Sequence, residues 1–589
     1  MADGERTGRE HRMISGTSDQ TGALAASADR APLPATPAVN VVSTMWRGIV
    51  LIAVISLFVG VYATWADPWT ALVVMIGYGG LLSCAVLAVT LRRPAAMRRL
   101  EYGVLGLAIS LYIASLPHLF PSSSNPRYPG DEGILVDRAG SALYRHADPY
   151  AIAWPHAVAG RSLGITLTLS GQVVSRYQYP PMAALLDAMA KPITPGLPTA
   201  GVIAAVALGI TTLLMFVLLP SPWRAVAPMV CLGLGIYQPD VWAGAPAMVM
   251  LPLLILALYR WTSIGSGGRL GRAGWVSAVC LGLAAAVHQL AWFIAPFLLM
   301  AIFLVRRADV PRREAARLAG AYAAVAVATF AVVNVPFMIW NFGDWLSGIG
   351  APVTQAAVPY GQGLVGITYY FIGGSGALSF YSYAALLYAI ALLICFGLWF
   401  QRLGPAVAIL PWTILFFPSR SLSGYFTVFV GLWVVSLLTI DYGVFPRAGR
   451  PRPLFQGTWA RAAVVAALFL PVAVCLAIAA GTSQPLRLTV GPLTPTGRIA
   501  ALTVTATNTS GGDIAPHFAL QAGAAPTAVW VIRRGPATLR RGATATYLIE
   551  APFALATTSR HVPVELRVFS AHPATLSSAT VTNGSARLR

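Results

Sequence analysis

Charged side chains are scarce in this sequence of 589 residues: only 10% are Asp, Glu, Lys or Arg. A soluble globular chain carries about 25% charged residues, so the scarcity excludes a string of soluble domains. Hydrophobic residues instead make up 57% of the sequence, and many fall in runs long enough to cross a bilayer. The composition therefore predicts a membrane protein with many spanning segments.

Lysine and cysteine are also rare. Lys191 is the only lysine, and the net charge of +20 comes from arginines that lie mostly in loops between apolar segments. Arginine in such loops orients membrane segments, so we expect no nucleic-acid partner. The five cysteines lie inside apolar stretches without a CxxC pair, a pattern that indicates small core residues. Without HExxH, CxxC or DxD motifs, the sequence predicts no dedicated metal site.

Thirteen apolar segments are predicted between two polar ends. They lie at about 46–65, 69–91, 102–120, 197–219, 225–238, 241–259, 273–288, 290–305, 318–338, 376–400, 404–417, 424–440 and 462–481. Several are shorter than the ~20 residues of a perpendicular span. The pairs 225–238/241–259 and 273–288/290–305 are alternatively broken or re-entrant helices. Residues 1–44 are expected to form a disordered cytoplasmic tail, and residues 45–481 a helical membrane domain.

The distribution of arginine predicts how these segments are oriented. If the segments alternate from a cytoplasmic N-terminus, the inner loops hold eighteen arginines. The short outer loops then hold one basic residue, Arg420. Because basic residues concentrate in cytoplasmic loops, we expect segments 121–196 and 339–375 and the region after 481 to lie outside the cytoplasm, on the outer side of the plasma membrane.

The C-terminal region, 482–589, has a different pattern. Runs with alternating apolar residues at 498–507, 528–532, 543–549 and 562–569 are separated by Gly, Pro, Asn and Ser. Alternation with a period of two is typical of strands with one buried face. At this spacing it predicts a small extracytoplasmic β-sandwich, which holds together without disulfides because the region contains no cysteine.

Three acidic residues follow the third segment closely, at the start of the loop 121–196. They are Asp131, Glu132 and Asp137. Apolar residues recur at helical spacing between Glu132 and His146, which predicts a helix lying on the membrane interface. The acids are then either reactive groups near the membrane surface or solvated residues favoured by the helix N-terminus. The spacing alone leaves both interpretations open.

The chain resembles the GT-C glycosyltransferases that use polyprenyl-phosphate sugars. The resemblance is to the polyprenyl-phosphate-mannose-dependent mannosyltransferases of actinobacteria and their uncharacterised multispanning relatives. It is carried by an ordered set of motifs within residues 100–430: Gly130-Asp131-Glu132, Asp148-Pro149-Tyr150, Tyr179-Pro180-Pro181, Gly282–Pro296, Asn334–Asn341 with Trp345, Tyr360–Leu364 and Ser419–Phe426.

This resemblance implies a GT-C-like fold whose catalytic outer loop is 121–196. The implied reaction moves a sugar, mannose or arabinose, from a polyprenyl-phosphate donor to an envelope glycolipid or glycan on the outer face, with inversion. The carboxylate base would be Asp131, with Asp137 and Glu132 as alternatives for the same role. No organic cofactor is implied, although a divalent metal bridging Asp131 and the donor phosphate stays open.

Candidate substrate-binding residues follow from the same motifs. Arg420 would hold the phosphate, unless it is a headgroup-snorkelling arginine. His288 and Gln289 at a segment end are either ligands of the substrate or buried structural residues. Tyr425, a neighbour of Arg420, would supply a further donor to the phosphate. The remaining candidates line the sugar site or shape its loops: Tyr150, Tyr179 and Gln362.

Two other functions fit the composition. A multispanning transporter or lipid flippase of the cell envelope places ionisable residues near mid-membrane in matched halves, whereas this chain concentrates them in one predicted outer loop. A structural scaffold would instead use the C-terminal region as its working part.

Overall fold

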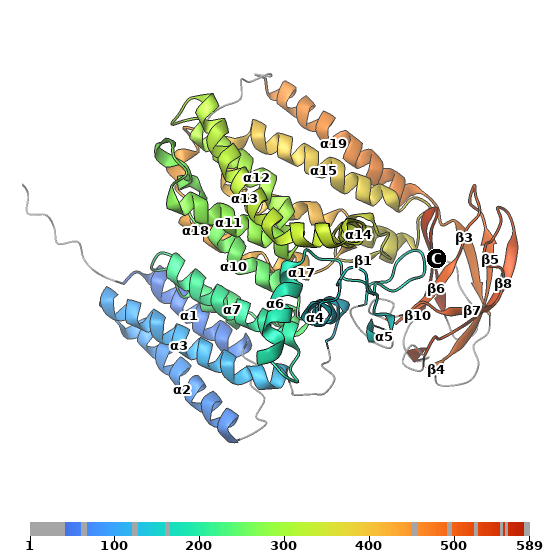
Figure 1. Ribbon diagram of the computed structural model, residues 1–589, viewed down its shortest axis with the longest axis horizontal. Helices are drawn as coiled ribbons and strands as arrows, with labels where there is room; N and C mark the ends of the chain where they lie inside the picture. The colour runs from blue at the N-terminus through green and yellow to red at the C-terminus, as the bar shows by residue number, and fades with distance from the viewer. Residues whose placement is uncertain are drawn as a thin grey trace, which may run out of the picture. The chain divides into compact units, whose positions relative to one another are not determined.

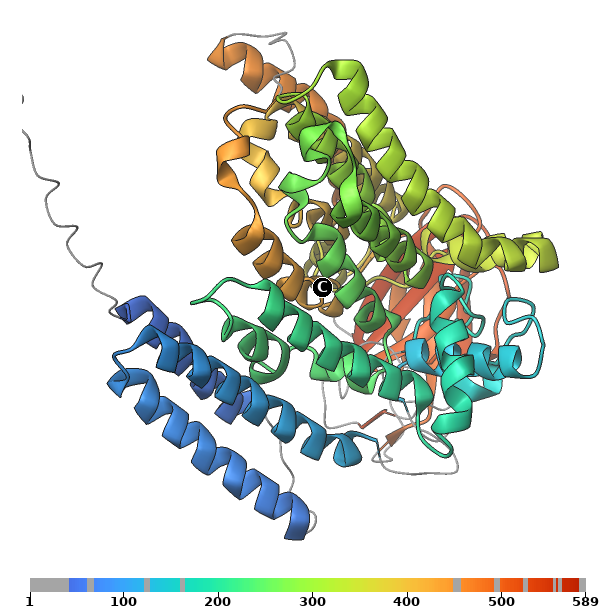
Figure 2. The ribbon, with the colours of Figure 1, turned by 60° about the vertical axis from the view of Figure 1, so that its left-hand side comes forward.

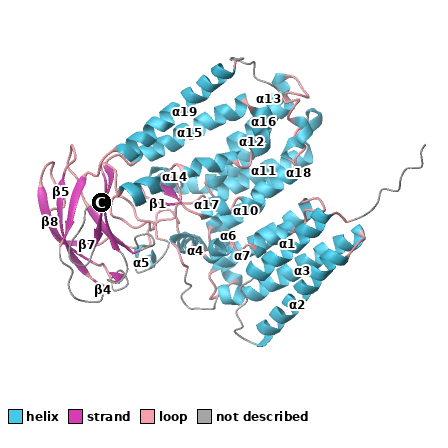
Figure 3. Cartoon of the chain, turned by 180° about the vertical axis from the view of Figure 1, so that it is seen from behind, coloured by secondary structure: helices cyan, strands magenta, loops and turns pink. Residues whose placement is uncertain are grey.

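The computed structural model describes residues 42–60, 68–120, 128–158, 165–448, 457–491, 498–522, 528–553, 558–559 and 564–581. The tail predicted to be disordered, 1–44, lies outside these ranges apart from its last three residues. Within them the chain is mostly helical and ends in a C-terminal β region (Figure 1). Figure 3 separates the two by colour, with the short strand β1 (Tyr360–Gly361) among the helices.

The helices occupy most of the chain up to residue 481. The α-helices are α1 (Thr44–Gly60), α2 (Pro68–Thr90), α3 (Pro94–Leu119), α4 (Asp131–Tyr144), α5 (Pro155–Val158), α6 (Met182–Ala190), α7 (Thr199–Leu218), α8 (Val226–Pro228), α9 (Gln238–Trp242), α10 (Pro246–Leu258), α11 (Gly271–Val287), α12 (Leu290–Arg306), α13 (Arg312–Trp340), α14 (Phe342–Thr354), α15 (Ser379–Leu398), α16 (Phe400–Leu403), α17 (Gly424–Thr427), α18 (Val430–Thr439) and α19 (Thr458–Gly481). Short 3-10 and π-helical turns are η1 (Lys191–Ile193), η2 (Met229–Gly233), η3 (Trp261–Ser263), η4 (Ser266–Gly268), η5 (Ile367–Ile372), η6 (Gly404–Ala406), η7 (Leu410–Phe416) and η8 (Tyr442–Val444).

Within the described ranges, six helices are long and apolar enough to cross a membrane: α2, α3, α7, α13, α15 and α19. Shorter apolar helices accompany them: α1, α10, α11, α12 and the stretch Gly424–Thr439. By their length and composition, these helices indicate a membrane protein. Three of the predicted segments are divided into separate elements, since 225–238 contains α8 and η2, 404–417 contains η6 and η7, and 424–440 contains α17 and α18. Pro405 and Pro411 interrupt the second because proline lacks the backbone N–H that a helix needs.

The first three helices pack through small residues. Figure 2 shows α1, α2 and α3 side by side. A Cβ added to Gly77 of α2 would lie 2.4 Å from Leu111 of α3, and one added to Gly80 would lie 2.8 Å from Leu107. The glycines therefore let the two helix backbones approach closely, as small residues do between membrane helices.

The loop predicted at 121–196 contains α4 and α6, which pack together. The helix predicted between Glu132 and His146 is present as α4, while its position at the membrane interface stays a prediction. Its apolar residues Ile134, Leu135, Ala139 and Ala142 are buried inside the protein. Gly140 faces Asp187 of α6, since an added Cβ would meet its carboxylate at 2.1 Å. The apolar face of α4 is therefore turned toward the protein.

The β region contains two larger sheets. Its strands are β3 (Leu486–Val490), β4 (Arg498–Ile499), β5 (Ala501–Asn508), β6 (His517–Ala522), β7 (Val531–Arg534), β8 (Thr544–Glu550), β9 (Thr558–Ser559), β10 (Val564–Ala571) and β11 (Ala574–Val581). One antiparallel sheet has the order β3-β5-β8-β7 and the other β11-β10-β6. Leu502, Val504 and Tyr547 of the first sheet share a buried core with Leu520 and Leu566 of the second. Strands β4, β5 and β8 confirm the runs at 498–507 and 543–549, and β7 contains the end of the run at 528–532. Strand β10 covers the run at 562–569 from Val564 on, while residues 562 and 563 lie outside the described ranges.

Candidate functional site

A cavity of about 210 Å³ gathers side chains from distant parts of the chain. Seven of the ten predicted site residues line it: Asp131, Glu132, Tyr179, His288, Gln289, Arg420 and Tyr425. They come from α4, the loop before α6, the break between α11 and α12, β2 (Arg420–Ser421) and α17. The fold therefore brings together carboxylates and a guanidinium that lie almost 300 residues apart in the sequence.

Asp131 is the first residue of α4 and is 4% exposed. Its Oδ2 accepts a hydrogen bond from the backbone N–H of Thr166 at 2.8 Å. A backbone N–H bound to a carboxylate fixes the orientation of the side chain, and the start of a helix favours a negative charge. Asp131 is therefore held rigidly at the cavity wall.

Glu132, the next residue, has an unusual acidity. Burial raises its pKa to about 8, and the charges of Asp131 and Asp240 add to the rise, while Arg420 opposes it. The carboxyl group of Glu132 is thus mostly protonated at neutral pH. A protonated carboxyl donates a hydrogen bond and cannot accept a proton, so Glu132 does not suit the role of general base below pH 8.

Asp240 of α9 belongs to this electrostatic group but was not among the predicted residues. Burial raises its pKa to about 6, and its Oδ2 has no hydrogen-bond partner within the described ranges. Gly424 of α17 lies against it, because an added Cβ would stand 3.0 Å from Asp240 Oδ1. Its signal in the sequence was an acidic residue between two apolar segments, which marks functional sites in membrane proteins.

Arg420 is positioned by a short parallel pair of strands. Tyr360 of β1 lies opposite Arg420 of β2, and Gly361 lies opposite Ser421. The N–H of Gln362 donates to the carbonyl of Ser421 at 2.7 Å. Gly361 has a φ of +118°, and a Cβ there would lie 1.9 Å from the Ser421 carbonyl oxygen. Only glycine permits this close approach, so the ladder beside Arg420 depends on it.

His288 and Gln289 lie where α11 ends and α12 begins. Nδ1 of His288 accepts the N–H of Leu290 at 3.1 Å, so the ring is neutral with its proton on Nε2. Its ring centroid lies 5.0 Å from that of Tyr179.

The amide nitrogen of Gln289 donates to the carbonyls of Gln178 at 2.6 Å and Ile349 at 3.0 Å. Its Oε1 is buried and has no hydrogen-bond partner in the described part of the chain. A buried acceptor without a partner is costly. A hydroxyl donor from a bound molecule would satisfy it.

Three predicted site residues lie outside the cavity lining. Tyr150 is buried behind it, where its hydroxyl donates to the carbonyl of Tyr179 at 2.8 Å. Gln362 lines a separate cavity of about 460 Å³. Asp137 forms an ion pair with Lys191 at 2.5 Å. Tyr150 therefore supports the cavity wall, and the structure does not bring Gln362 or Asp137 to the other candidates.

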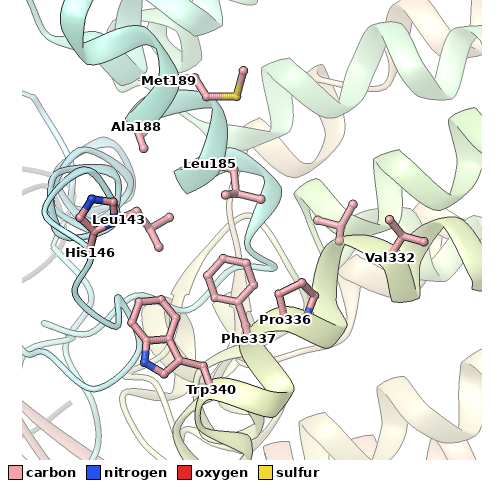
Figure 4. A pocket seen from close by; sticks show the side chains of 10 residues that line it. Leu143, His146, Leu185, Ala188, Met189, Val332, Pro336, Phe337 and Trp340 are labelled. Carbon is pink, nitrogen blue, oxygen red and sulfur yellow. The ribbon is translucent and has the colours of Figure 1, made fainter.

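An apolar groove of about 710 Å³ runs beside the loop helices (Figure 4). Leu143 and His146 line it from α4 and the residues after it, Leu185 and Met189 from α6, and Val332, Pro336, Phe337 and Trp340 from α13. Phe337 packs edge-on against Tyr150, with ring centroids 6.1 Å apart. Tyr150 thus connects Phe337 of this groove to Tyr179 of the polar cavity.

The described residues include no group of three or more His, Cys, Asp or Glu side chains arranged to hold a metal ion. A metal bridging Asp131 and a phosphate stays a prediction.

No protein-family model matches the chain, and no curated protein shows significant similarity to it. The function is therefore argued from the site.

Proposed function

We propose that the chain is a polytopic glycosyltransferase of the GT-C type in the plasma membrane. It would move a sugar, mannose or arabinose, from a polyprenyl-phosphate donor to an envelope glycolipid or glycan acceptor on the outer face. The observation that supports this most is the lining of one cavity by Asp131 and Arg420 together. A glycosyl transfer from a phosphate needs a carboxylate base and a cation for the leaving group, both within reach of one sugar.

In the proposed reaction the acceptor hydroxyl oxygen attacks the anomeric carbon from the face opposite the phosphate. The new glycosidic C–O bond forms while the bond from carbon to the phosphate oxygen breaks, and its electron pair stays on that oxygen. The hydroxyl proton passes to Asp131. Because Oδ2 of Asp131 already accepts the Thr166 N–H, Oδ1 would receive the proton. The products are an inverted glycoside and polyprenyl phosphate.

The other cavity residues would bind and orient the donor. Arg420 would hold the phosphate, because a guanidinium matches phosphate oxygens through paired hydrogen bonds. The proton on Glu132 prevents a second negative charge from repelling that phosphate. Nε2–H of His288 is a further donor, and the partnerless Oε1 of Gln289 would accept a sugar hydroxyl.

The apolar groove beside the cavity would take the donor's polyprenyl chain. Its lining is formed almost wholly by hydrocarbon side chains, which suit a branched lipid and not a sugar. Tyr150, which connects Phe337 of the groove to Tyr179 of the cavity, would separate the chain from the charged head.

The finer architecture belongs to the same proposal. It includes a cytoplasmic N-terminus, some thirteen segments, and two C-terminal sheets that form an extracytoplasmic sandwich. A reporter active only in the cytoplasm, fused after Arg589, should stay silent. A strong signal would contradict the orientation and the outward-facing site.

The direct test of function uses purified protein in lipid vesicles. Labelled polyprenyl-phosphate mannose and arabinose are supplied with a crude pool of envelope lipids. We expect one of the two sugars to appear in a new glycolipid with inverted anomeric configuration. If neither sugar is transferred, and labelled lipid instead crosses the vesicle membrane, the transporter interpretation replaces this proposal.

A further inference from the structure

The cavity is built on three chain segments that pair with one another through their backbones. We call residues 165–174, 356–364 and 416–421 the platform. Its hydrogen bonds run from Leu169 N–H to Ala356 O (2.7 Å), Val358 N–H to Leu167 O (2.8 Å), Tyr360 N–H to Ser419 O (3.1 Å), Gln362 N–H to Ser421 O (2.7 Å) and Leu364 N–H to Phe416 O (2.9 Å). The three segments are therefore one mechanically connected unit.

The platform carries a functional group on each outer segment. At one side the N–H of Thr166 holds Asp131. At the other side, Arg420 projects from β2 into the same cavity. The distance between the proposed base and the proposed phosphate ligand thus depends on how these segments are held.

The β region covers the platform. Leu167, Leu169 and Val358 share one buried cluster with Phe569 and Leu576 of the three-stranded sheet. Residues 165–174 form a hairpin in which Leu167 pairs with Val173. Its tip also lies close to the β region, since a Cβ on Gly171 would lie 2.3 Å from Nδ1 of His517. The three-stranded sheet β11-β10-β6 is therefore packed against the platform.

Arg567 of β10 joins the β region to Tyr369, a member of the same buried cluster, and is 1% exposed. Its Nη1 donates to the carbonyl of Tyr369 at 2.7 Å, and its guanidinium carbon lies 3.9 Å from the centroid of the Tyr369 ring. Glu565 neutralises its charge, and the Tyr369 hydroxyl donates to Gln521 of β6. Tyr369 belongs to η5, which follows the middle platform segment directly.

We propose that Arg567 is a positioning residue that fixes the platform and, through it, the separation of Asp131 and Arg420. The C-terminal region is then part of the transfer unit and not a separate module joined through α19. The consequence for catalysis rests on the proposed function, while the consequence for the platform does not.

The test compares full-length variants by hydrogen–deuterium exchange in detergent. Arg567→Gln removes the charge and the stacking plane, and Arg567→Lys keeps the charge without the planar fork. Arg487→Gln, at an exposed arginine of β3, is the matched control. In Arg567→Gln we expect exchange in peptides covering 165–174 and 356–364 to rise about tenfold, the effect of losing a hydrogen bond to a charged group. Arg567→Lys should fall between, and Arg487→Gln should match wild type.

A second variant changes the partner of Arg567 in η5. Tyr369→Leu removes the ring under the guanidinium but leaves the β region's own core intact. It should raise platform exchange in the same way, while exchange in β5 and β8 stays at the wild-type level. If both Arg567→Gln and Tyr369→Leu leave the platform as protected as in wild type, the proposal is wrong.

Transfer kinetics give the third readout. Misplacement by about 1 Å costs on the order of 10²-fold in rate, so we expect kcat of Arg567→Gln to fall by about that factor, with partial rescue in Arg567→Lys. Increased platform exchange with unchanged kcat would overturn the positioning role. A wild-type protein that transfers no sugar would overturn the proposed function alone, since the exchange experiment uses no substrate.

Discussion

Oδ2 of Asp131 lies 2.8 Å from the backbone nitrogen of Thr166, so a hairpin far along the chain orients the first side chain of α4. The carboxylate is thereby held at a cavity that also contains Arg420. This contact links a helix start, a hairpin and a strand pair into one site.

Glu132 should make donor binding depend on pH. Its pKa is raised to about 8, so it is neutral below that pH and gains a negative charge as the pH rises through it. The charge would repel the donor phosphate and compete for Arg420. We expect the donor KM to increase above pH 8 in wild type and to stay flat in Glu132→Gln. The same rise in both proteins would refute this role.

The raised pKa of Glu132 also makes the stability of the folded protein depend on pH. Between its ordinary value of 4.5 and about 8, the folded state binds more protons than the unfolded state. The contribution of Glu132 to the free energy of unfolding is therefore present in full below pH 4.5 and is lost as the pH rises through 8. Glu132→Gln should remove it, which thermal unfolding at pH 5 and pH 9 can measure.

Lys191 should be required for stability and not for chemistry. Its ammonium lies 2.5 Å from Asp137 and 3.1 Å from the fully buried Asp187. Lys191→Met leaves both carboxylates without a cation, and breaking such a buried group costs about 3–5 kcal/mol. We expect a clear loss of thermal stability at pH 8 and a smaller one at pH 5, because burial raises the pKa of Asp187 well above its ordinary value and this carboxylate loses its charge as the pH falls. An equal loss at both pH values would contradict this account.

Gly361 offers a sharp test of the strand pair beside Arg420. Gly361→Ala combines a φ of +118° with a Cβ placed 1.9 Å from the Ser421 carbonyl oxygen, so β1 and β2 must separate. We expect donor binding to weaken and transfer to fall by about 10²-fold. Gly366→Ala is the control, since its Cβ meets nothing closer than 3.6 Å. If both variants are equally active, the ladder does not position Arg420.

The β region should fold by itself. Its two sheets share a core that includes Val504, Tyr547 and Leu566, separate from the helical core. Residues 484–589 expressed alone should give a β-type circular dichroism spectrum and a cooperative thermal transition. A helical or disordered spectrum would show that the helices supply part of its stability.

Local patterns in the sequence predicted much of this architecture, because helix and strand periodicities are encoded in neighbouring residues. The alternation at 498–507 became β4 and β5, and the apolar spacing after Glu132 became α4. Contacts between residues far apart in the sequence could not be predicted from these local periodicities. The hydrogen bond from Thr166 to Asp131 uses a backbone N–H that every residue except proline supplies, so no residue type marks it.

The same limit explains the differences at the candidate site. Asp137 resembled Asp131 in sequence, but one helical turn and a half further on it meets Lys191 instead of the cavity. Asp240 is visible in the sequence as an acid between two apolar segments, but only the contact between α9 and Gly424 of α17 places it beside the site. Gln362 has a suitable side chain, but the structure joins it to the strand beside Arg420 through its backbone N–H and places it in the lining of a separate cavity.

The rate of sugar transfer by Asp131→Asn is the most direct test of the central claim. The substitution keeps the size of the side chain and its contact with Thr166 but removes the proton acceptor. Transfer from the polyprenyl-phosphate sugar should fall by about 10²–10⁴-fold while donor binding persists, and Asp137→Asn should stay near the wild-type rate. Full turnover by Asp131→Asn, with loss of turnover in Asp137→Asn, would contradict the assignment of the base.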